Sequence, residues 1–267
     1  MVGVSTGAAA ESVATSMTTV GATTPGVVRI EYYTDPLCCW SWAFEPVVRQ
    51  LRQRFGSSLE WSIVLGGMIE TWATFRDPMN DVGAPPQLAP LWHMAARATG
   101  VPIDPAIWHV DPPASSYPAS VAVKAAGLQG VQAAEAYLGL ARQAVMTRRL
   151  NIARRDVLVA LGGELAASGA CAFDIATFQS DLGGPDAIEA FRADLQRARF
   201  LRIGRFPTLI VHGPAGSRIA VGYRPADVME RILAAVASGL LPGTSLCARE
   251  TELPEKMSRH DDCHSTT

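Results

Sequence analysis

A cysteine stands where a predicted strand gives way to a predicted helix near the start of the chain. Residues 27–33 are β-branched and aromatic, which favours a strand, whereas the apolar residues of 44–55 recur at helical spacing. Cys38 therefore lies at a strand-to-helix turn, where free backbone N–H groups and the helix dipole favour an anion. We expect a lowered pKa for the Cys38 thiol and expect it to be the nucleophile.

The partner sulfur of a C-x-x-C motif is absent, because the residue three positions beyond Cys38 is Ser41. A dithiol can store two electrons as an internal disulfide, but Cys38 can form a disulfide only with another molecule or another cysteine. The adjacent Cys39 is not expected to bridge to Cys38, because such a ring distorts normal disulfide geometry. We expect the Ser41 hydroxyl to donate a hydrogen bond to the Cys38 thiolate.

A second landmark is Pro207, which follows Phe206 at the start of the apolar run 207–212. A central strand does not tolerate proline in its interior, so Pro207 marks the mouth of this strand. Taken alone, a trans bond is the expected state, since only about 5% of X–Pro bonds are cis.

Two motifs together resemble the DsbA-like branch of the thioredoxin superfamily, over about residues 27–239. They are Asp35-Pro36-Leu37-Cys38 at the turn and Gly204-Arg205-Phe206-Pro207-Thr208 at the proline. The resemblance implies an α/β, thioredoxin-like fold with an inserted all-helical lobe, and a cis Pro207 that faces the cysteine. It also implies that the Phe206 backbone pairs with a bound peptide or glutathione. The expected catalytic residues are Cys38, Ser41 and Pro207, and the expected substrate-binding residues are Phe206, Trp40, Trp42 and Cys39.

The resemblance implies a thiol-disulfide oxidoreductase or isomerase that works through mixed disulfides of Cys38, on a protein or on glutathione. An external thiol such as glutathione, or a tail cysteine, would resolve the mixed disulfide. Two alternatives stay open. The fragment Ser41-Trp42 followed by Phe44-Glu45 is similar to the kappa-class glutathione transferases and chromene-carboxylate isomerases. The Asp-Pro-Leu-Cys start is similar to intracellular protease adaptors, which bind a client, and there Cys38 would sense redox state or be inert.

The predicted organisation has four parts: a disordered leader (1–26), a thioredoxin-like domain (27–67 and 200–239), a helical insertion (68–199) and a disordered tail (240–267). The leader lacks the basic start and apolar core of a secretory signal. Residues 68–117 are expected to form connections rich in Pro and Trp. Helices are expected over about 118–128, 131–149, 154–168, 174–182 and 185–199 and from Pro225, and strands near 59–66, 207–212 and 217–222.

Composition and charge limit the classes of partner and the cellular compartment that the sequence predicts. The net charge is −2, with 48% hydrophobic residues among 267, so nothing indicates nucleic acid or an anionic membrane surface. No segment has the ~20 apolar residues that span a bilayer. The five cysteines (38, 39, 171, 247 and 263) form no framework, which suits a reducing cytoplasm. We expect no metal and no tightly bound cofactor, with glutathione as a candidate co-substrate.

Overall fold

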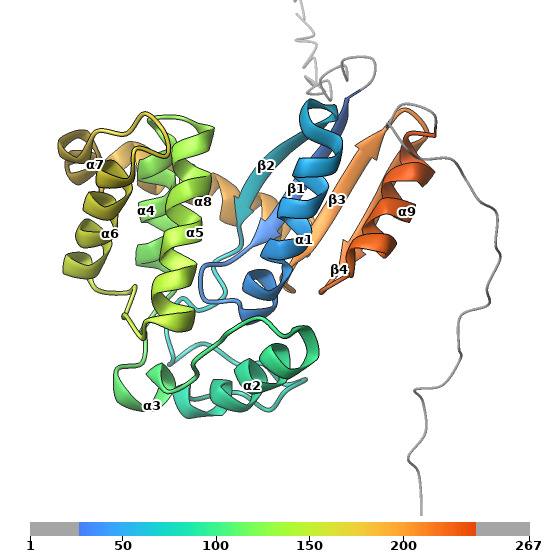
Figure 1. Ribbon diagram of the computed structural model, residues 1–267. Helices are drawn as coiled ribbons and strands as arrows, with labels where there is room; N and C mark the ends of the chain where they lie inside the picture. The colour runs from blue at the N-terminus through green and yellow to red at the C-terminus, as the bar shows by residue number, and fades with distance from the viewer. Residues whose placement is uncertain (1–26, 239–267) are drawn as a thin grey trace, which may run out of the picture.

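The computed structural model describes residues 27–238 (Figure 1). The predicted leader 1–26 and the predicted tail 240–267, which carries Cys247 and Cys263, lie outside the described residues. Within the described part of the chain, none of the helices combines the length and the apolar character that crossing a membrane requires.

A mixed β-sheet forms one half of the described structure. Its strands are β1 (Val28–Thr34), β2 (Leu59–Leu65), β3 (Thr208–Gly213) and β4 (Gly216–Val221), in the spatial order β2-β1-β3-β4. β1 is parallel to β2 and antiparallel to β3, and β3 is antiparallel to β4. Parallel neighbours need a crossover connection, and α1 (Cys39–Phe55) with the short 3-10 helix η1 (Gly56–Ser58) supplies it.

The two faces of the sheet are covered differently. Alternate side chains of a strand point to opposite faces, and one face packs on α1 and on α9 (Ala226–Val236). The other face packs on the carboxyl end of α8 (Pro185–Phe200). The buried residues of the first face include Val28, Ile30, Tyr32, Phe44, Leu51, Leu209, Val211, Met229 and Leu233.

Between β2 and β3 the chain forms a helical lobe beside the sheet (Figure 1). The α/β fold class with an inserted helical lobe is thereby confirmed. The expected helices from 118 onward are present with small shifts of their ends. The lobe contains α2 (Leu88–Thr99), α3 (Ile107–Val110), α4 (Tyr117–Gly127), α5 (Val131–Thr147), α6 (Arg155–Ser168), α7 (Ile175–Asp181) and α8, with the 3-10 helix η2 (Pro85–Gln87) before α2.

The prediction that 68–117 forms only connections is wrong, because α2 and α3 lie there. Pro90 reads as a helix breaker in the sequence, but it lies in the first turn of α2. The backbone N–H groups of a first turn have no acceptor within the helix, so the N–H that proline lacks costs α2 no hydrogen bond. The helix is held by packing, since Trp92 and Ala95 are buried in the lobe core. It ends at Gly100, whose φ of 73° is a left-handed cap.

Candidate functional site

The turn that carries Cys38 is held by Asp35, which is fully buried. The Asp35 carboxylate accepts hydrogen bonds from the Leu37 amide at 2.9 Å and the Met68 amide at 2.7 Å. Its backbone carbonyl accepts from the Cys38 amide at 3.2 Å. Burial raises the pKa of the Asp35 carboxyl, and the two amides offset part of that rise. The turn is therefore fixed from within the protein, directly before α1.

Cys38 is the N-cap residue of α1. Its backbone is extended, with φ −80° and ψ 109°, and its sulfur accepts a hydrogen bond from the Ser41 amide at 3.4 Å. This is the contact that an N-cap side chain makes with the first turn of a helix. The sulfur therefore lies at the amino end of α1, as the sequence predicts.

The Phe206 carbonyl oxygen faces the Cys38 sulfur, although in the chain Cys38 precedes the helical insertion and Phe206 follows it. The Cys38 thiol donates a hydrogen bond to this oxygen at 3.3 Å. The peptide bond between Phe206 and Pro207 is cis. The ring of Phe206 lies over Gly66, where a Cβ would come within 1.9 Å of the ring. Residues more than 160 positions apart are thus brought together at one site.

The expected lowering of the Cys38 pKa is wrong. Burial raises the pKa of this thiol, since only 5% of Cys38 is exposed and desolvation disfavours its thiolate. The Ser41 hydroxyl and amide, and the positive charge of Arg142, favour the thiolate, but they offset only part of the rise. The negative charge of Asp35 acts with burial. At neutral pH Cys38 is therefore mostly a thiol.

Ser41 is fully buried at the start of α1. Its amide reaches the Cys38 sulfur, and its carbonyl accepts a hydrogen bond from the Tyr32 hydroxyl at 3.3 Å. No partner among the described residues meets hydrogen-bond geometry with its own hydroxyl oxygen. The contact that Ser41 makes with the sulfur is through its backbone amide, and donation from its hydroxyl to the Cys38 thiolate stays a prediction.

A buried cation behind the turn was not found from the sequence. Arg142 of α5 is fully buried and donates hydrogen bonds to Glu45 of α1 and to the hydroxyl of Thr34. Its guanidinium lies 5.7 Å from the ring centroid of Tyr32. Arg142 joins the lobe to the end of β1. The signal was present, because Arg142 occupies the stripe of α5 that Leu138 and other apolar residues fill.

The two tryptophans beside the nucleophile are half-buried. The Trp42 indole donates a hydrogen bond to the Pro102 carbonyl at 3.0 Å, which ties it to the lobe. The Trp40 ring lies 6.3 Å from the ring of Tyr223, centroid to centroid. Both rings pack against the lobe core, and Trp40 also contacts the loop after β4 through Tyr223.

Cys39 lies outside the site. It is 6% exposed, belongs to the lobe core and points to the Leu91 carbonyl oxygen, 3.9 Å from its sulfur. The helical rotation of about 100° per residue turns Cys39 away from Cys38 and toward α2. It is placed as a small apolar core residue, and no described contact brings it to the Cys38–Phe206 pair.

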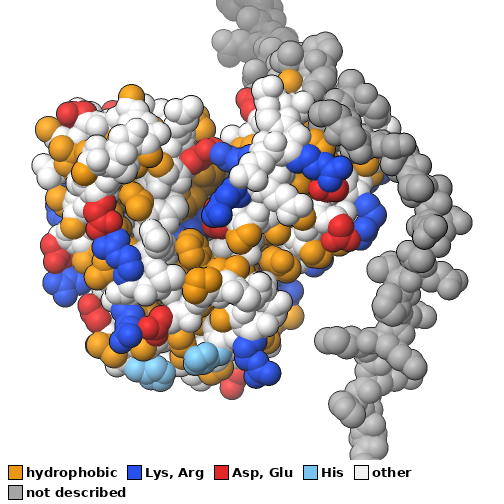
Figure 2. All heavy atoms as spheres, in the orientation of Figure 1, with side chains coloured by type: hydrophobic (Ala, Val, Ile, Leu, Met, Phe, Trp, Pro, Cys, Tyr) orange, Lys and Arg blue, Asp and Glu red, His pale blue; other side chains and the backbone are white. Residues whose placement is uncertain are grey.

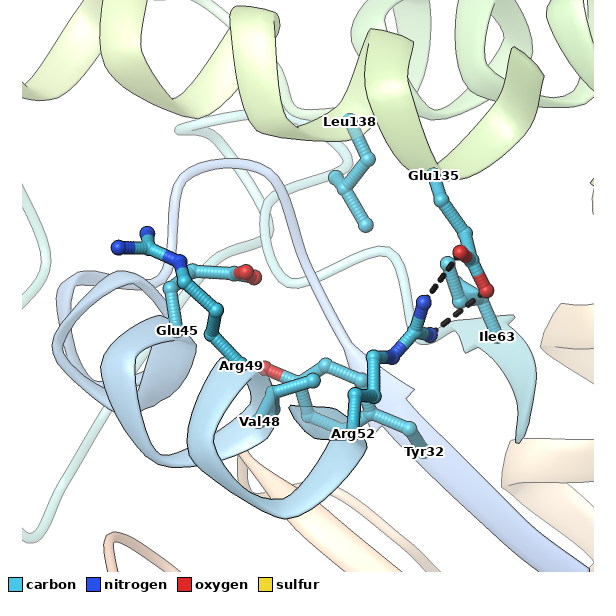
Figure 3. Close-up of a pocket in the computed structure, with 8 residues that line it drawn as sticks. All are labelled: Tyr32, Glu45, Val48, Arg49, Arg52, Ile63, Glu135 and Leu138. Carbon is cyan, nitrogen blue, oxygen red and sulfur yellow. Dashed lines mark hydrogen bonds and ion pairs between the residues drawn. The ribbon is translucent and has the colours of Figure 1, made fainter. Parts of the chain in front are cut away.

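A cavity of about 200 Å³ lies between α1 and the lobe (Figures 2 and 3). Its wall carries Glu45 and Arg49, and the bidentate pair of Arg52 with Glu135 closes one side. It is lined by charged and apolar side chains but by no cysteine. Thiol chemistry therefore belongs to the Cys38 turn and not to this cavity.

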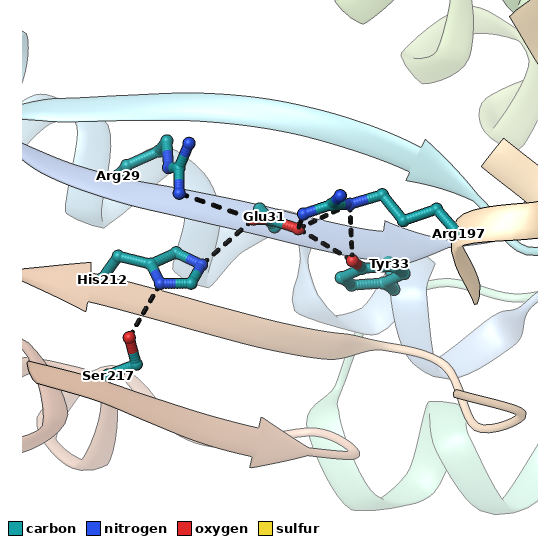
Figure 4. Close-up of polar contacts among 6 residues, drawn as sticks. All are labelled: Arg29, Glu31, Tyr33, Arg197, His212 and Ser217. Atoms are coloured by element: carbon teal, nitrogen blue, oxygen red, sulfur yellow. Dashed lines mark hydrogen bonds and ion pairs between the residues drawn. The ribbon is translucent and has the colours of Figure 1, made fainter. Parts of the chain in front are cut away.

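A buried carboxylate on the other face of the sheet ties α8 to β1 (Figure 4). Glu31 accepts hydrogen bonds from Arg197 at 2.6 Å and from the Tyr33 hydroxyl at 2.8 Å, and it lies 3.0 Å from His212. Burial alone would raise the pKa of Glu31, but Arg197 and Tyr33 hold it below its usual value. Within residues 27–238, no group of three or more His, Cys, Asp and Glu side chains is arranged as a metal site.

Comparison with known proteins identifies the family. A thioredoxin family profile matches residues 32–224, which is most of the chain. The chain therefore belongs to the thioredoxin family, and its fold is that of the DsbA-like branch.

Two solved structures share this fold. A candidate protein disulfide isomerase from Nitrosomonas europaea is 22% identical, with a TM-score of 0.63 over 78% of this chain and 96% of that chain. The cytosolic disulfide reductase DsbM from Pseudomonas aeruginosa is 21% identical, with a TM-score of 0.56 over 78% of this chain and 93% of that chain. At these identities the likeness shows the fold alone.

A curated relative is more similar in sequence. The ClpXP adapter protein SpxH of Halalkalibacterium halodurans is 31% identical over 183 residues, which are 68% of this chain and 58% of that protein. The chain thus spans less than two thirds of the length of this relative.

Proposed function

We propose that this protein exchanges disulfides with a protein partner through Cys38, with a mixed disulfide as the intermediate. One observation carries the proposal: the Cys38 sulfur lies at the amino end of α1 and 3.3 Å from the Phe206 carbonyl oxygen, with Ser41 in place of a second cysteine. The sulfur has a backbone surface beside it on which a partner can align, and no internal thiol one turn away to displace that partner.

The exchange balances in two steps. The Cys38 thiolate attacks one sulfur of a partner disulfide, a Cys38–partner disulfide forms, and the other partner sulfur leaves as a thiolate. An external thiol, for which we propose glutathione in a reducing cytoplasm, then attacks the partner sulfur and releases Cys38. The partner is left as a mixed disulfide with glutathione, and no net oxidant is needed.

The Phe206 carbonyl has a role in the first step. In the reduced protein it accepts a hydrogen bond from the Cys38 thiol. When Cys38 becomes part of a disulfide that proton is gone, and the carbonyl is free to accept a backbone N–H of the partner. This hydrogen bond offsets part of the cost of ordering the partner segment.

A protease adaptor is the second candidate, and the burial of Cys38 favours it. A thiol that is 5% exposed and has a raised pKa reacts slowly at neutral pH. The similarity to a relative named as a ClpXP adapter supports the same candidate. In that case the surface around Cys38 binds a client without turnover.

The glutathione transferase alternative is less favoured by the site. In that branch a serine occupies the reactive position, which Cys38 takes in this chain, while Ser41 is fully buried.

Turnover separates the candidates. The protein is incubated with a disulfide-bonded protein and glutathione, and the glutathione mixed disulfide formed on that protein is followed by mass for the native chain, Cys38→Ser and the control Cys171→Ser. Exchange through Cys38 predicts loss of turnover in Cys38→Ser alone. If the native chain shows no turnover, and a client pulled down by it is retained equally by Cys38→Ser, the adaptor is the function and the exchange proposal is wrong.

A further inference from the structure

The segment that leads into the Cys38 site is strongly basic. Residues 195–207 contain four arginines and neither Asp nor Glu, in a protein whose net charge is −2. Arg197 is paired with Glu31 at 2.6 Å. Arg199, Arg202 and Arg205 are exposed, and none forms an ion pair with another described residue. Their charges are therefore available to a partner.

One of these arginines directly precedes the residue that contacts the reacting sulfur. Arg205 directly precedes Phe206, whose carbonyl oxygen contacts Cys38. The Arg205 carbonyl accepts a hydrogen bond from the Thr208 hydroxyl at 2.7 Å, which fixes this backbone. Neighbouring Cα atoms are about 3.8 Å apart, so the Arg205 backbone lies one residue from the carbonyl that contacts the sulfur.

A fourth arginine comes from the loop after β4. The Gly222 amide donates a hydrogen bond to the Pro207 carbonyl at 2.7 Å, which holds this loop against the proline. Arg224 in the same loop is exposed and forms no ion pair with a described residue. We call Arg199, Arg202, Arg205 and Arg224 the basic rim.

Acidic side chains near the site do not cancel the basic rim. Asp35 is fully buried beneath the turn. Glu70 is exposed, and Tyr117 feels both its charge and that of Arg199, yet no ion pair joins Glu70 to any described residue. Asp227, three residues beyond Arg224, is also exposed, but its carboxylate is paired with Arg231 at 2.9 Å.

An aromatic side chain stands within the basic rim. Phe200 is 86% exposed, and the neighbouring Leu201 is 39% exposed. Arginine and aromatic residues are the types enriched at protein interfaces and at their energetic centres. A large exposed ring between unpaired arginines fits a macromolecular partner that covers it.

We propose that the basic rim selects protein partners whose cysteine lies in an acidic segment with an apolar side chain that packs on Phe200. The inference rests on the proposed exchange through Cys38 and names the class of partner. Positive charge around a reactive group speeds the approach of acidic partners by about 10-fold to 1,000-fold at low ionic strength. Salt screens this attraction, since the Debye length at 0.15 M salt is about 8 Å.

The test compares three cysteine peptides that differ only in flanking residues: Glu, Ser or Lys on both sides, each with one Phe. Each is activated as a disulfide with thionitrobenzoate, and the rate of attack by Cys38 is measured in chains carrying Cys171→Ser, Cys247→Ser and Cys263→Ser. Rates are divided by those of the neutral thiol β-mercaptoethanol, which removes the intrinsic reactivity of each peptide. We expect the acidic peptide to react about 10-fold faster than the basic one, and the ratio to fall severalfold in 0.5 M salt.

Two double variants separate the basic rim from net charge. Arg202→Ser with Arg205→Ser should bring the acidic-to-basic ratio close to one. Arg49→Ser with Arg54→Ser removes the same charge from α1, about 16 Å and about 24 Å along the helix from Cys38, and should leave the ratio unchanged. Equal rates for all peptides, or a ratio that survives in the rim variant, would overturn the inference.

A binding measurement keeps the inference separate from the proposed exchange. If Cys38 attacks none of the peptides, the exchange proposal fails, and the basic rim is decided by fluorescence anisotropy with peptides carrying Ser for Cys. Tighter binding of the acidic peptide that is lost in the rim variant upholds the inference. Equal binding of the acidic and basic peptides overturns the inference. It is also overturned if the rim variant differs from the native chain toward oxidised glutathione but toward none of the peptides.

Discussion

Replacement of Ser41 by cysteine should create a bridge to Cys38. The two residues are one helical turn apart, and the Ser41 amide already lies 3.4 Å from the Cys38 sulfur. Cα atoms three positions apart at the start of a helix are about 5 Å apart, inside the range that disulfides span. The Ser41 hydroxyl has no hydrogen-bond partner among the described residues, so its removal breaks none.

The expected magnitude follows from the size of the ring. A loop of four residues removes about 6 cal/mol/K of chain entropy from the unfolded state, or about 2 kcal/mol at 25 °C. The larger sulfur at a fully buried position costs about 1 kcal/mol in packing, since overpacking of a core is destabilising. Oxidised Ser41→Cys should therefore be about 1 kcal/mol more stable than the native chain, and its reduced form slightly less stable.

The assay is peptide mapping of the oxidised variant together with urea unfolding of both redox forms. The Cys39→Ser background serves as the control, because it leaves only the bridge between positions 38 and 41 at this turn. A 38–41 peptide pair and new disulfide-reductase activity are expected. Oxidised protein with no 38–41 crosslink would show that the proposed register of the turn is wrong.

Three further predictions follow from the contacts around the site. Arg142→Met should raise the pKa of Cys38 further, because it removes a positive charge that favours the thiolate. The pH profile of the alkylation rate of Cys38 should therefore shift to higher pH, and an unchanged profile would contradict this role of Arg142. Glu31→Gln should lower the free energy of unfolding by about 1–3 kcal/mol at pH 7. Because the pKa of Glu31 is lowered in the folded protein, its stabilising contribution is present above the unfolded pKa and is lost as the pH falls through the folded pKa. The difference in the free energy of unfolding between the native chain and Glu31→Gln, measured by urea unfolding, should therefore shrink below about pH 4. A difference that stays constant with pH would argue against this role. Gly66→Ala should displace the ring of Phe206, whose nearest atom would lie 1.9 Å from the new Cβ, and so slow exchange of Cys38 with a protein partner without unfolding the lobe; a native exchange rate would refute this.

Local sequence patterns predict much of the fold. The β-branched run before Cys38 and the helical spacing after it placed β1, α1 and the turn, because both periodicities depend only on neighbouring residues. α2 was missed since Pro90 reads as a breaker in sequence, whereas its place in the first turn costs the helix nothing. Its stability comes from the burial of Trp92, which is a tertiary property.

The charge state of the site could not be predicted in the same way. The helix dipole at Cys38 is a local feature, and it indicated a lowered pKa. Burial by distant segments is not local, and it dominates, since Phe206 and the lobe leave only 5% of the cysteine exposed. Arg142 was overlooked for the same reason, because its position in the apolar stripe of α5 gains meaning only when that stripe faces β1.

The most direct test of the central claim is intact-mass analysis with peptide mapping after incubation with oxidised glutathione across pH 6–9. Exchange through Cys38 predicts one glutathionyl group on Cys38, formed faster as pH rises because the thiolate must form first, and absent in Cys38→Ser. Glutathione on other cysteines alone, or no adduct on Cys38 at any pH, would contradict the account.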